Sequence, residues 1–117
     1  MDFELFNTYS NKTELFIPLD DNDIRIYACG PTVYDYIHVG NARPLIIFDV
    51  LVRFLKLIYP KVTYVRNITD VDDKIIVQAN QNKESINNLT ERTIKAFSDD
   101  ADALFVKKPD FEPRATE

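Results

Sequence analysis

The chain of 117 residues contains no tryptophan, one cysteine, one histidine, one methionine and two glycines. A single cysteine excludes an internal disulfide and agrees with a reducing compartment. No uncharged apolar run is long enough to span a membrane, and the first residues lack the basic and apolar regions of a secretory signal. We therefore expect a soluble, cytoplasmic monomer that has no membrane partner.

The chain also lacks an excess of positive charge, since 14 Lys and Arg face 19 Asp and Glu. The net charge of −5 excludes a basic surface that wraps nucleic-acid phosphates. If an RNA is a partner, most of its electrostatic contacts must lie elsewhere. With 45% hydrophobic residues, the length suits one domain or a piece of one.

Apolar spacing predicts alternating strands and helices. The expected strands cover 23–29 and 62–67, and the expected helices cover 42–59, with Pro44 in the first turn, 70–80, and a longer stretch from 86 to 104. Residues 18–23 should form a polar turn, and 106–117 a loop. A strand, a helix and a second strand form a parallel pair with a right-handed crossover. Two such strands have little stability alone, so we expect a truncated α/β domain.

Helix 42–59 is apolar around most of its circumference and should be buried on more than one side. The loops after the two strands should share one crevice, because ligands of open parallel sheets bind beyond the carboxyl ends of the strands. The chain's only cysteine, only histidine and both glycines lie within 29–41, where the first of these loops begins.

Each of these residues has a structural and a functional interpretation. Gly30 and Gly40 could serve tight packing, and Gly40 could also admit a phosphate to exposed helix N–H groups. For Cys29 we favour a small buried side chain over a metal ligand. For His38 a structural hydrogen bond and a phosphate contact are about equally favoured.

The aspartates after the second strand are similarly ambiguous. We favour Asp70 as an N-cap paired with Asp73, and the alternative is that Asp70, Asp72 and Asp73 hold Mg²⁺. Arg66 could meet a phosphate or pair with these aspartates.

Three long motifs carry a resemblance to a known family. "CGPTVYDYIHVGNARP" (29–44), "FDVLVRFL" (48–55) and "YVRNITDVDDKI" (64–75) closely resemble the amino-terminal segment of cysteinyl-tRNA synthetase, a class I aminoacyl-tRNA synthetase. The likeness runs from "LFNT" (5–8) to "PRAT" (113–116). The mycothiol-synthesis ligase, which also activates cysteine, is a second candidate, and a noncatalytic binding module or decayed paralogue is a third.

The resemblance implies a Rossmann-type, nucleotidylyl-transferase-like sheet, with residues 1–117 forming the amino-terminal part of the catalytic domain. It implies activation of cysteine with ATP, accompanied by Mg²⁺, and transfer of the cysteinyl group to tRNA(Cys). "HVGN" (38–41) matches the ATP-binding His-Ile-Gly-His motif, which makes His38 and Asn41 catalytic. The residues implied in ATP binding are Thr32, His38, Gly40 and Asn41. The residues implied in amino-acid binding are Cys29, Gly30, Thr32 and Thr69, with Cys29 also the first zinc ligand.

The chain departs from the family pattern in two ways. Asn41 replaces the second histidine of the motif, so this position cannot carry positive charge. The Lys-Met-Ser-Lys-Ser loop, the remaining zinc ligands and the anticodon-binding region are missing from these 117 residues. We therefore expect no aminoacylation by this stretch alone.

Overall fold

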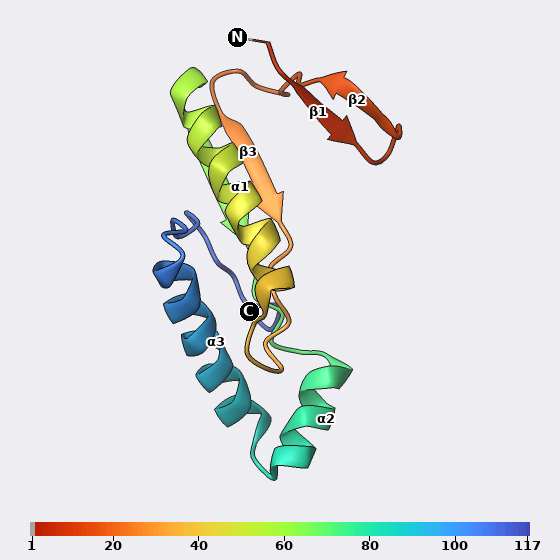
Figure 1. The fold of residues 1–117 in the computed structure, drawn as a ribbon, viewed down its shortest axis with the longest axis vertical. Coiled ribbons are helices and arrows are strands. Elements are labelled where there is room, and N and C mark those ends of the chain that lie inside the picture. The colour runs from red at the N-terminus through yellow and green to blue at the C-terminus, as the bar shows by residue number, and fades with distance from the viewer. Residues whose placement is uncertain (1) are drawn as a thin grey trace.

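The structure is a computed structural model, and it describes residues 2–117. It is elongated, with extents of 53 × 29 × 27 Å. Figure 1 shows a small hairpin at one end, a strand and a long helix in the middle, and two shorter helices at the other end. The elements are β1 (Glu4–Asn7), β2 (Lys12–Leu15), β3 (Ile24–Ala28), α1 (Val39–Ile58), β4 (Val62–Arg66), α2 (Asp73–Asn82) and α3 (Ile86–Ala103).

The expected strand, helix and strand are present as β3, α1 and β4. The two strands are parallel, and their register runs from Ile24 opposite Val62 to Ala28 opposite Arg66. Both strands alternate between more and less buried residues, as half-buried strands do. The predicted α/β unit with a parallel sheet is therefore confirmed.

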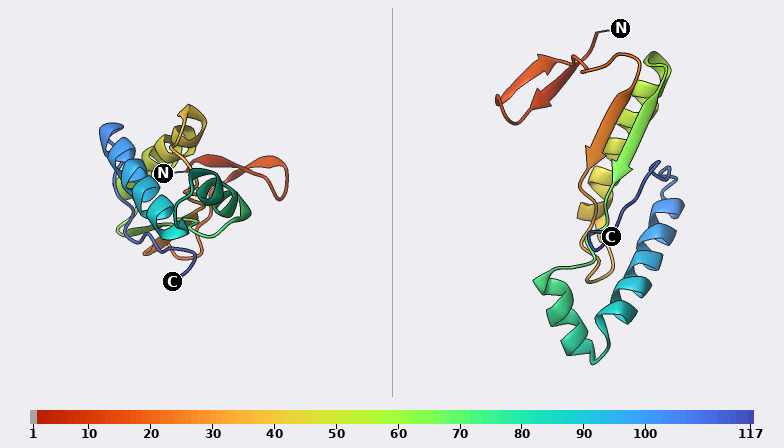
Figure 2. Two further views of the ribbon diagram at one scale, coloured as in Figure 1. Left: turned by 90° about the horizontal axis from the view of Figure 1, so that it is seen from below. Right: turned by 180° about the vertical axis from the view of Figure 1, so that it is seen from behind.

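The expected loop at the carboxyl terminus is only partly a loop. This segment runs along the edge of β4 that does not pair with β3. Arg66 N–H donates to the carbonyl oxygen of Phe111 at 3.1 Å, and Ile68 N–H, just past the strand, donates to that of Pro113 at 2.9 Å. Ala115 N–H in turn donates to the oxygen of Ile68 at 2.9 Å. Pro113 fits here because its carbonyl is used and its missing N–H is not. Figure 2 shows this blue segment returning toward the end of β4.

Helix α1 begins three residues earlier than expected, because His38 caps it. Pro44 is consequently the sixth helical residue and does not lie in the first turn. The expectation that α1 is buried on several sides is wrong for the described residues. The buried residues of α1 are Leu45, Val52 and Leu55, whereas its exposed large hydrophobic residues are Val39, Ile46, Ile47, Val50 and Leu57.

Two polar residues of α1, Asp49 and Arg53, bind the segment that follows α3. Arg53 donates through Nη2 to the carbonyl oxygen of Phe105 at 2.9 Å, and Lys107 N–H donates to Asp49 Oδ1 at 3.0 Å. None of the helices in residues 2–117 is long and apolar enough to cross a membrane.

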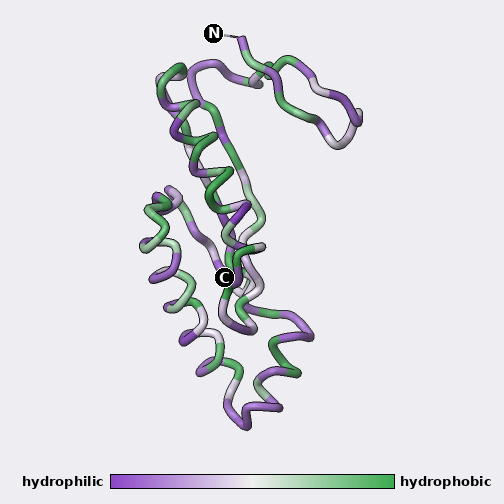
Figure 3. Tube along the Cα trace, in the orientation of Figure 1, coloured by the Kyte–Doolittle hydropathy of each residue, from purple (hydrophilic) through white to green (hydrophobic). Residues whose placement is uncertain are grey.

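Three buried clusters form the core. The first lies between α1 and the sheet, the second lies beneath the loops that follow β3 and β4, and the third joins α1 to α3. Figure 3 shows the hydrophobic colour along β3 and recurring along α1, in contrast to the hydrophilic turn between α2 and α3. The clusters contain Ile24, Ala28, Val52, Leu55, Val62 and Tyr64; Val33, Ile68, Ile75, Ala79 and Leu89; and Leu45, Phe97, Ala101 and Val106.

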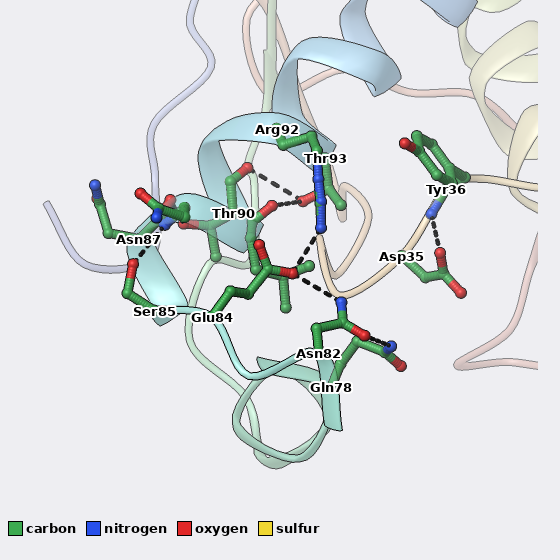
Figure 4. Close-up of polar contacts among 12 residues, drawn as sticks. Asp35, Tyr36, Gln78, Asn82, Glu84, Ser85, Asn87, Thr90, Arg92 and Thr93 are labelled. Carbon is green, nitrogen blue, oxygen red and sulfur yellow. Dashed lines mark hydrogen bonds and ion pairs between the residues drawn. The ribbon is translucent and has the colours of Figure 1, made fainter. Parts of the chain in front are cut away.

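The turn between α2 and α3 is built by polar side chains. Glu84 accepts from Asn82 Nδ2 and from Arg92 Nη2, both at 2.7 Å, and the Ser85 hydroxyl accepts the N–H of Asn88 as the N-cap of α3 (Figure 4). Lys83 ends α2 in the left-handed conformation, with φ of 54°. These contacts fix where α3 begins, so both expected helices are confirmed with small shifts of their ends.

The hairpin of β1 and β2 was not anticipated. All eight of its strand residues are exposed, so neither strand shows the burial alternation that identifies a half-buried strand. It is anchored at its base, where the ring of Phe3 stacks on Phe16 at 5.0 Å and meets the edge of Phe54 at 5.1 Å. The predicted polar turn before β3 is present, with Asn22 N–H bonded to Asp20 Oδ1.

Candidate active site

The loops that follow β3 and β4 meet, as the topology predicts. Thr32 and Thr69 form an isolated parallel bridge beyond the ends of the strands. Thr69 N–H donates to the carbonyl oxygen of Pro31 at 3.0 Å, and Val33 N–H donates to that of Thr69 at 3.1 Å. The two threonines assigned to the amino-acid pocket therefore lie side by side at the carboxyl edge of the sheet.

A second contact between these loops joins Gly30 to Asn67, a residue that the sequence did not single out. Gly30 N–H donates to Asn67 Oδ1 at 2.7 Å. A Cβ added to Gly30 would lie 1.5 Å from the backbone oxygen of Asn67. Gly30 is thus required for close backbone packing, which supports the structural interpretation of this glycine. The Asn at the first position after β4 was the available signal, because Asn caps and ties turns.

A small cavity of about 80 Å³ opens beside this contact. Cys29, Gly30 and Asn41 line it together with Tyr64 and Arg66. The structure thus brings three of the predicted site residues to one cavity. The predicted residues that do not line it are Thr32, His38, Gly40 and Thr69.

Cys29 lies immediately after β3 and is exposed, so the expectation that it is a small buried side chain is wrong. Its Sγ lies 3.7 Å from the carbonyl oxygen of Gly30, a weak contact that leaves the thiol available. Within residues 2–117 no three His, Cys, Asp or Glu side chains are grouped to hold a metal. A zinc site needs about three or four protein ligands. Cys29 can therefore supply only one of them.

His38 is the N-cap of α1. Its Nδ1 accepts the N–H of Gly40 at 3.0 Å, while Asn41 Oδ1 accepts the backbone N–H of His38 at 3.0 Å. The two bonds form a capping box, so the structural interpretation of His38 holds. Because Nδ1 is an acceptor here, neutral His38 carries its proton on Nε2, which remains a donor. His38 is an exposed residue, so its side chain is accessible.

The expected phosphate site on free N–H groups after Gly40 is not present in this form. Gly40 N–H is bonded to the imidazole, and Asn41 N–H is bonded to the carbonyl oxygen of His38 at 2.8 Å. The side-chain donors at this helix end are His38 Nε2 and the amide Nδ2 of Asn41.

Two of the three aspartates have separate structural roles. Asp72, and not Asp70, is the N-cap of α2, and it accepts the N–H of Lys74 at 2.8 Å. Asp70 is buried and accepts from the hydroxyl of Thr116 at 2.7 Å. The predicted cap is therefore displaced by two residues, because Asp70 is taken by the carboxyl-terminal segment. Together with Asp73 they form no metal group within residues 2–117.

Arg66, the last residue of β4, is 3% exposed, and its side-chain hydrogen bonds go to Glu112 rather than to these aspartates. It donates through Nε and Nη2 to Glu112, and its guanidinium lies over the ring of Phe97 at 5.1 Å. Burial raises the pKa of the neighbouring Tyr64 phenol, against the opposing effect of the Arg66 charge. This side of the cavity is therefore a buried structural wall.

Comparison with known proteins decides the family. The family described as "tRNA synthetases class I (C) catalytic domain" matches residues 15–117. The chain belongs to this family. It is 55% identical over 113 residues to the Cysteine--tRNA ligase of Ehrlichia ruminantium (strain Gardel), covering 97% of this chain and 25% of that protein. The Cysteine--tRNA ligase of Rhodospirillum centenum is 54% identical over 116 residues, covering 99% of this chain and 25% of that protein.

Membership of the class I (C) family confirms the expected fold class, since the parallel pair, its crossover helix and the strand-like carboxyl-terminal segment form part of a Rossmann-like sheet. The chain spans about a quarter of the length of the curated relatives it matches.

Proposed function

We propose that residues 1–117 are the amino-terminal part of the catalytic domain of a cysteine–tRNA ligase. The intact protein would activate cysteine with ATP and transfer it to tRNA(Cys). The observation that carries this proposal is the meeting of the first and third family motifs (29–44 and 64–75) at one sheet edge, with Thr32 bridged to Thr69 and Gly30 bonded to Asn67. The relatives that support it are named Cysteine--tRNA ligase.

His38 and Asn41 would stabilise the reacting phosphate of ATP. Adenylate formation is attack by a carboxylate on the α-phosphate, so positioning and stabilisation of developing negative charge are the main needs. The bond from Gly40 to Nδ1 leaves Nε2–H of His38 as a donor for a ligand. Asn41 uses its oxygen on the cap and keeps its Nδ2 as a second donor, which offsets part of the loss of the histidine found in the family motif.

Cys29, Gly30, Thr32 and Thr69 would form the amino-acid half of the site, and Thr32 with Gly40 would also border ATP. The exposed thiol of Cys29 fits one zinc ligand, and zinc would bind the thiolate of substrate cysteine. The other zinc ligands would come from the rest of the intact protein. Mg²⁺ would accompany ATP and bind mainly its phosphates.

Cysteine-dependent exchange between pyrophosphate and ATP by the intact protein tests the activation step. Charging of tRNA(Cys), compared with transfer to glucosaminyl-inositol, separates the synthetase from the mycothiol-synthesis ligase. Absence of any cysteine-dependent exchange would favour the noncatalytic alternative. Residues 1–117 alone should not aminoacylate.

Substitution of His38 separates its two roles. His38→Asn should keep the cap, because Asn is among the best N-cap residues, and slow adenylate formation by roughly 10²–10³-fold, the loss typical of one charge-stabilising donor. His38→Ala should slow the reaction equally and also destabilise α1 by about 1 kcal/mol. An unchanged exchange rate in His38→Asn would remove the imidazole from the mechanism.

A further inference from the structure

Asn67 holds Gly30 through both its side chain and its backbone. The Oδ1 of Asn67 accepts Gly30 N–H at 2.7 Å, across 37 residues of sequence. The backbone oxygen of Asn67 lies where a Gly30 Cβ would be, so the two chains touch without space for a methyl group. Gly30 follows Cys29 directly, so this contact sets where the chain turns after the thiol.

The other end of the same amide reaches Thr69. Asn67 Nδ2 lies 3.5 Å from Thr69 Oγ1, at the limit of a hydrogen bond. Thr69 is itself fixed to the first loop, because its N–H donates to Pro31 and it bridges Thr32. One side chain therefore connects the turn beside Cys29 with the hydroxyl of Thr69, and it is half-buried between them.

We infer that Asn67 is a positioning residue for the amino-acid half of the site. It acts through Gly30 and Thr69 and holds the thiol of Cys29 and the hydroxyl of Thr69 at a fixed separation. This inference rests on the proposed function for its ligand, an amino acid that carries a thiol. The helix end that would meet ATP is held separately by the His38 and Asn41 cap, so loss of Asn67 should affect cysteine more than ATP.

Chemistry distinguishes two substitutions. Asn67→Ala removes the acceptor for Gly30 and the donor for Thr69. Asn67→Asp keeps the acceptor for Gly30 and loses the N–H donor, so Thr69 can contact residue 67 only by donating its own hydroxyl proton. Asn82→Ala is the matched control, because Asn82 also bonds through both ends of its amide but lies at the end of α2.

The test measures KM for cysteine and for ATP in the intact protein by cysteine-dependent pyrophosphate exchange. Asn67→Ala should raise KM for cysteine about tenfold, the effect of losing about one hydrogen bond, and change KM for ATP less than about twofold. Asn67→Asp should recover part of this loss, and Asn82→Ala should match the unsubstituted protein. Equal increases in both KM values, or none in either, would overturn the inference.

A second measurement does not depend on activity. Hydrogen exchange of the Gly30 amide in the intact protein should be faster by about tenfold in Asn67→Ala and stay slow in Asn67→Asp, because only the alanine removes its acceptor. If the unsubstituted protein shows no cysteine-dependent exchange but the Gly30 amide follows this pattern, the proposed function fails and the contact stands. Unchanged Gly30 exchange in Asn67→Ala overturns the inference in either case.

Discussion

The hairpin and the carboxyl edge of the sheet are both built from short segments, yet they are held in opposite ways. In β1 and β2, hydrogen bonds join only neighbouring segments, every strand residue is exposed, and the aromatic contacts of Phe3 and Phe16 anchor the base. At the sheet edge, bonds join residues far apart in sequence, such as Gly30 and Asn67, which are 37 positions apart, or Asp70 and Thr116, which are 46 positions apart. A substitution at the edge therefore acts on several segments at once, whereas one in the hairpin stays local.

The largest effect should follow from Gly30→Ala, because the added methyl group would collide with the backbone of Asn67. Backbone cannot yield as a side chain can, so we expect a loss of about 3 kcal/mol or more in the free energy of unfolding. Urea denaturation measures it.

Gly40→Ala is the matched control for Gly30→Ala. Its Cβ would meet only the imidazole of His38, at 2.7 Å from Cε1. The side chain can move, and alanine favours helix by about 1 kcal/mol over glycine. Stability should therefore change little, while adenylate formation slows. A Gly30→Ala protein as stable as Gly40→Ala would contradict the close backbone contact.

A smaller effect at the same edge should follow from Glu112→Ala. Arg66 is 4% exposed in its side chain and would be left as a buried charge without its carboxylate. Removal of one partner of a fully buried pair costs about 3–5 kcal/mol, and the loss here should be smaller than that because the side chain of Glu112 is 31% exposed. Glu91→Ala removes the partner of Arg114 at the surface, where such pairs contribute about 0–1 kcal/mol. If Glu112→Ala and Glu91→Ala lost equal free energy of unfolding, measured with heat or urea, the Arg66 side chain would be accessible to water.

In the hairpin, only the base should be sensitive. Phe16→Ala removes the ring stacked on Phe3 and should cost about 1–2 kcal/mol, less than the 3–5 kcal/mol typical of a fully buried phenylalanine. Phe6→Ser changes a residue that is 60% exposed and should stay within about 0.5 kcal/mol. A loss in Phe6→Ser as large as that in Phe16→Ala would contradict the local character of the hairpin.

The regular elements were predictable because their signals are local. The alternation in β3, the β-branched and aromatic residues of β4 and the three- and four-residue spacing in α3 identified strands and helices, and the order of the elements placed the two loops together. The hairpin was missed because it has no buried face to create a pattern. Its turn contains Asn11 in the left-handed conformation, but the following residue is Lys12 rather than glycine.

The location of the site could be predicted from the sequence, but its hydrogen-bond partners could not. Thr69 was placed near the first loop by topology alone. The partners of Arg66 and Asp70 are residues 46 positions away in a segment with two prolines, which was expected to be a loop. From the sequence, Arg66 and Asp70 were therefore expected to interact with residues close to them in the chain. In the structure Asp72, and not Asp70, is the N-cap of α2.

The smallest expected effect is a pH dependence at the wall of the cavity. Burial raises the pKa of Tyr64 in the folded chain. The neutral phenol therefore makes its full contribution to the free energy of unfolding below the unfolded pKa of about 10. This contribution is lost as pH rises through the folded-state pKa. Between about pH 8 and about pH 10.5, the free energy of unfolding should fall more for the unsubstituted chain than for Tyr64→Phe. Parallel curves would show that Tyr64 is solvated.

The segment that returns along β4 has a consequence for the order of events during synthesis. By Ala115, β4 is paired with β3 along one edge, and the end of β4 together with Ile68 is hydrogen-bonded to residues 111–115 on the other. Chains fold from the amino terminus as they emerge from the ribosome. If a longer polypeptide follows, its nascent first quarter already carries the residues that protect the end of β4 from pairing with another chain.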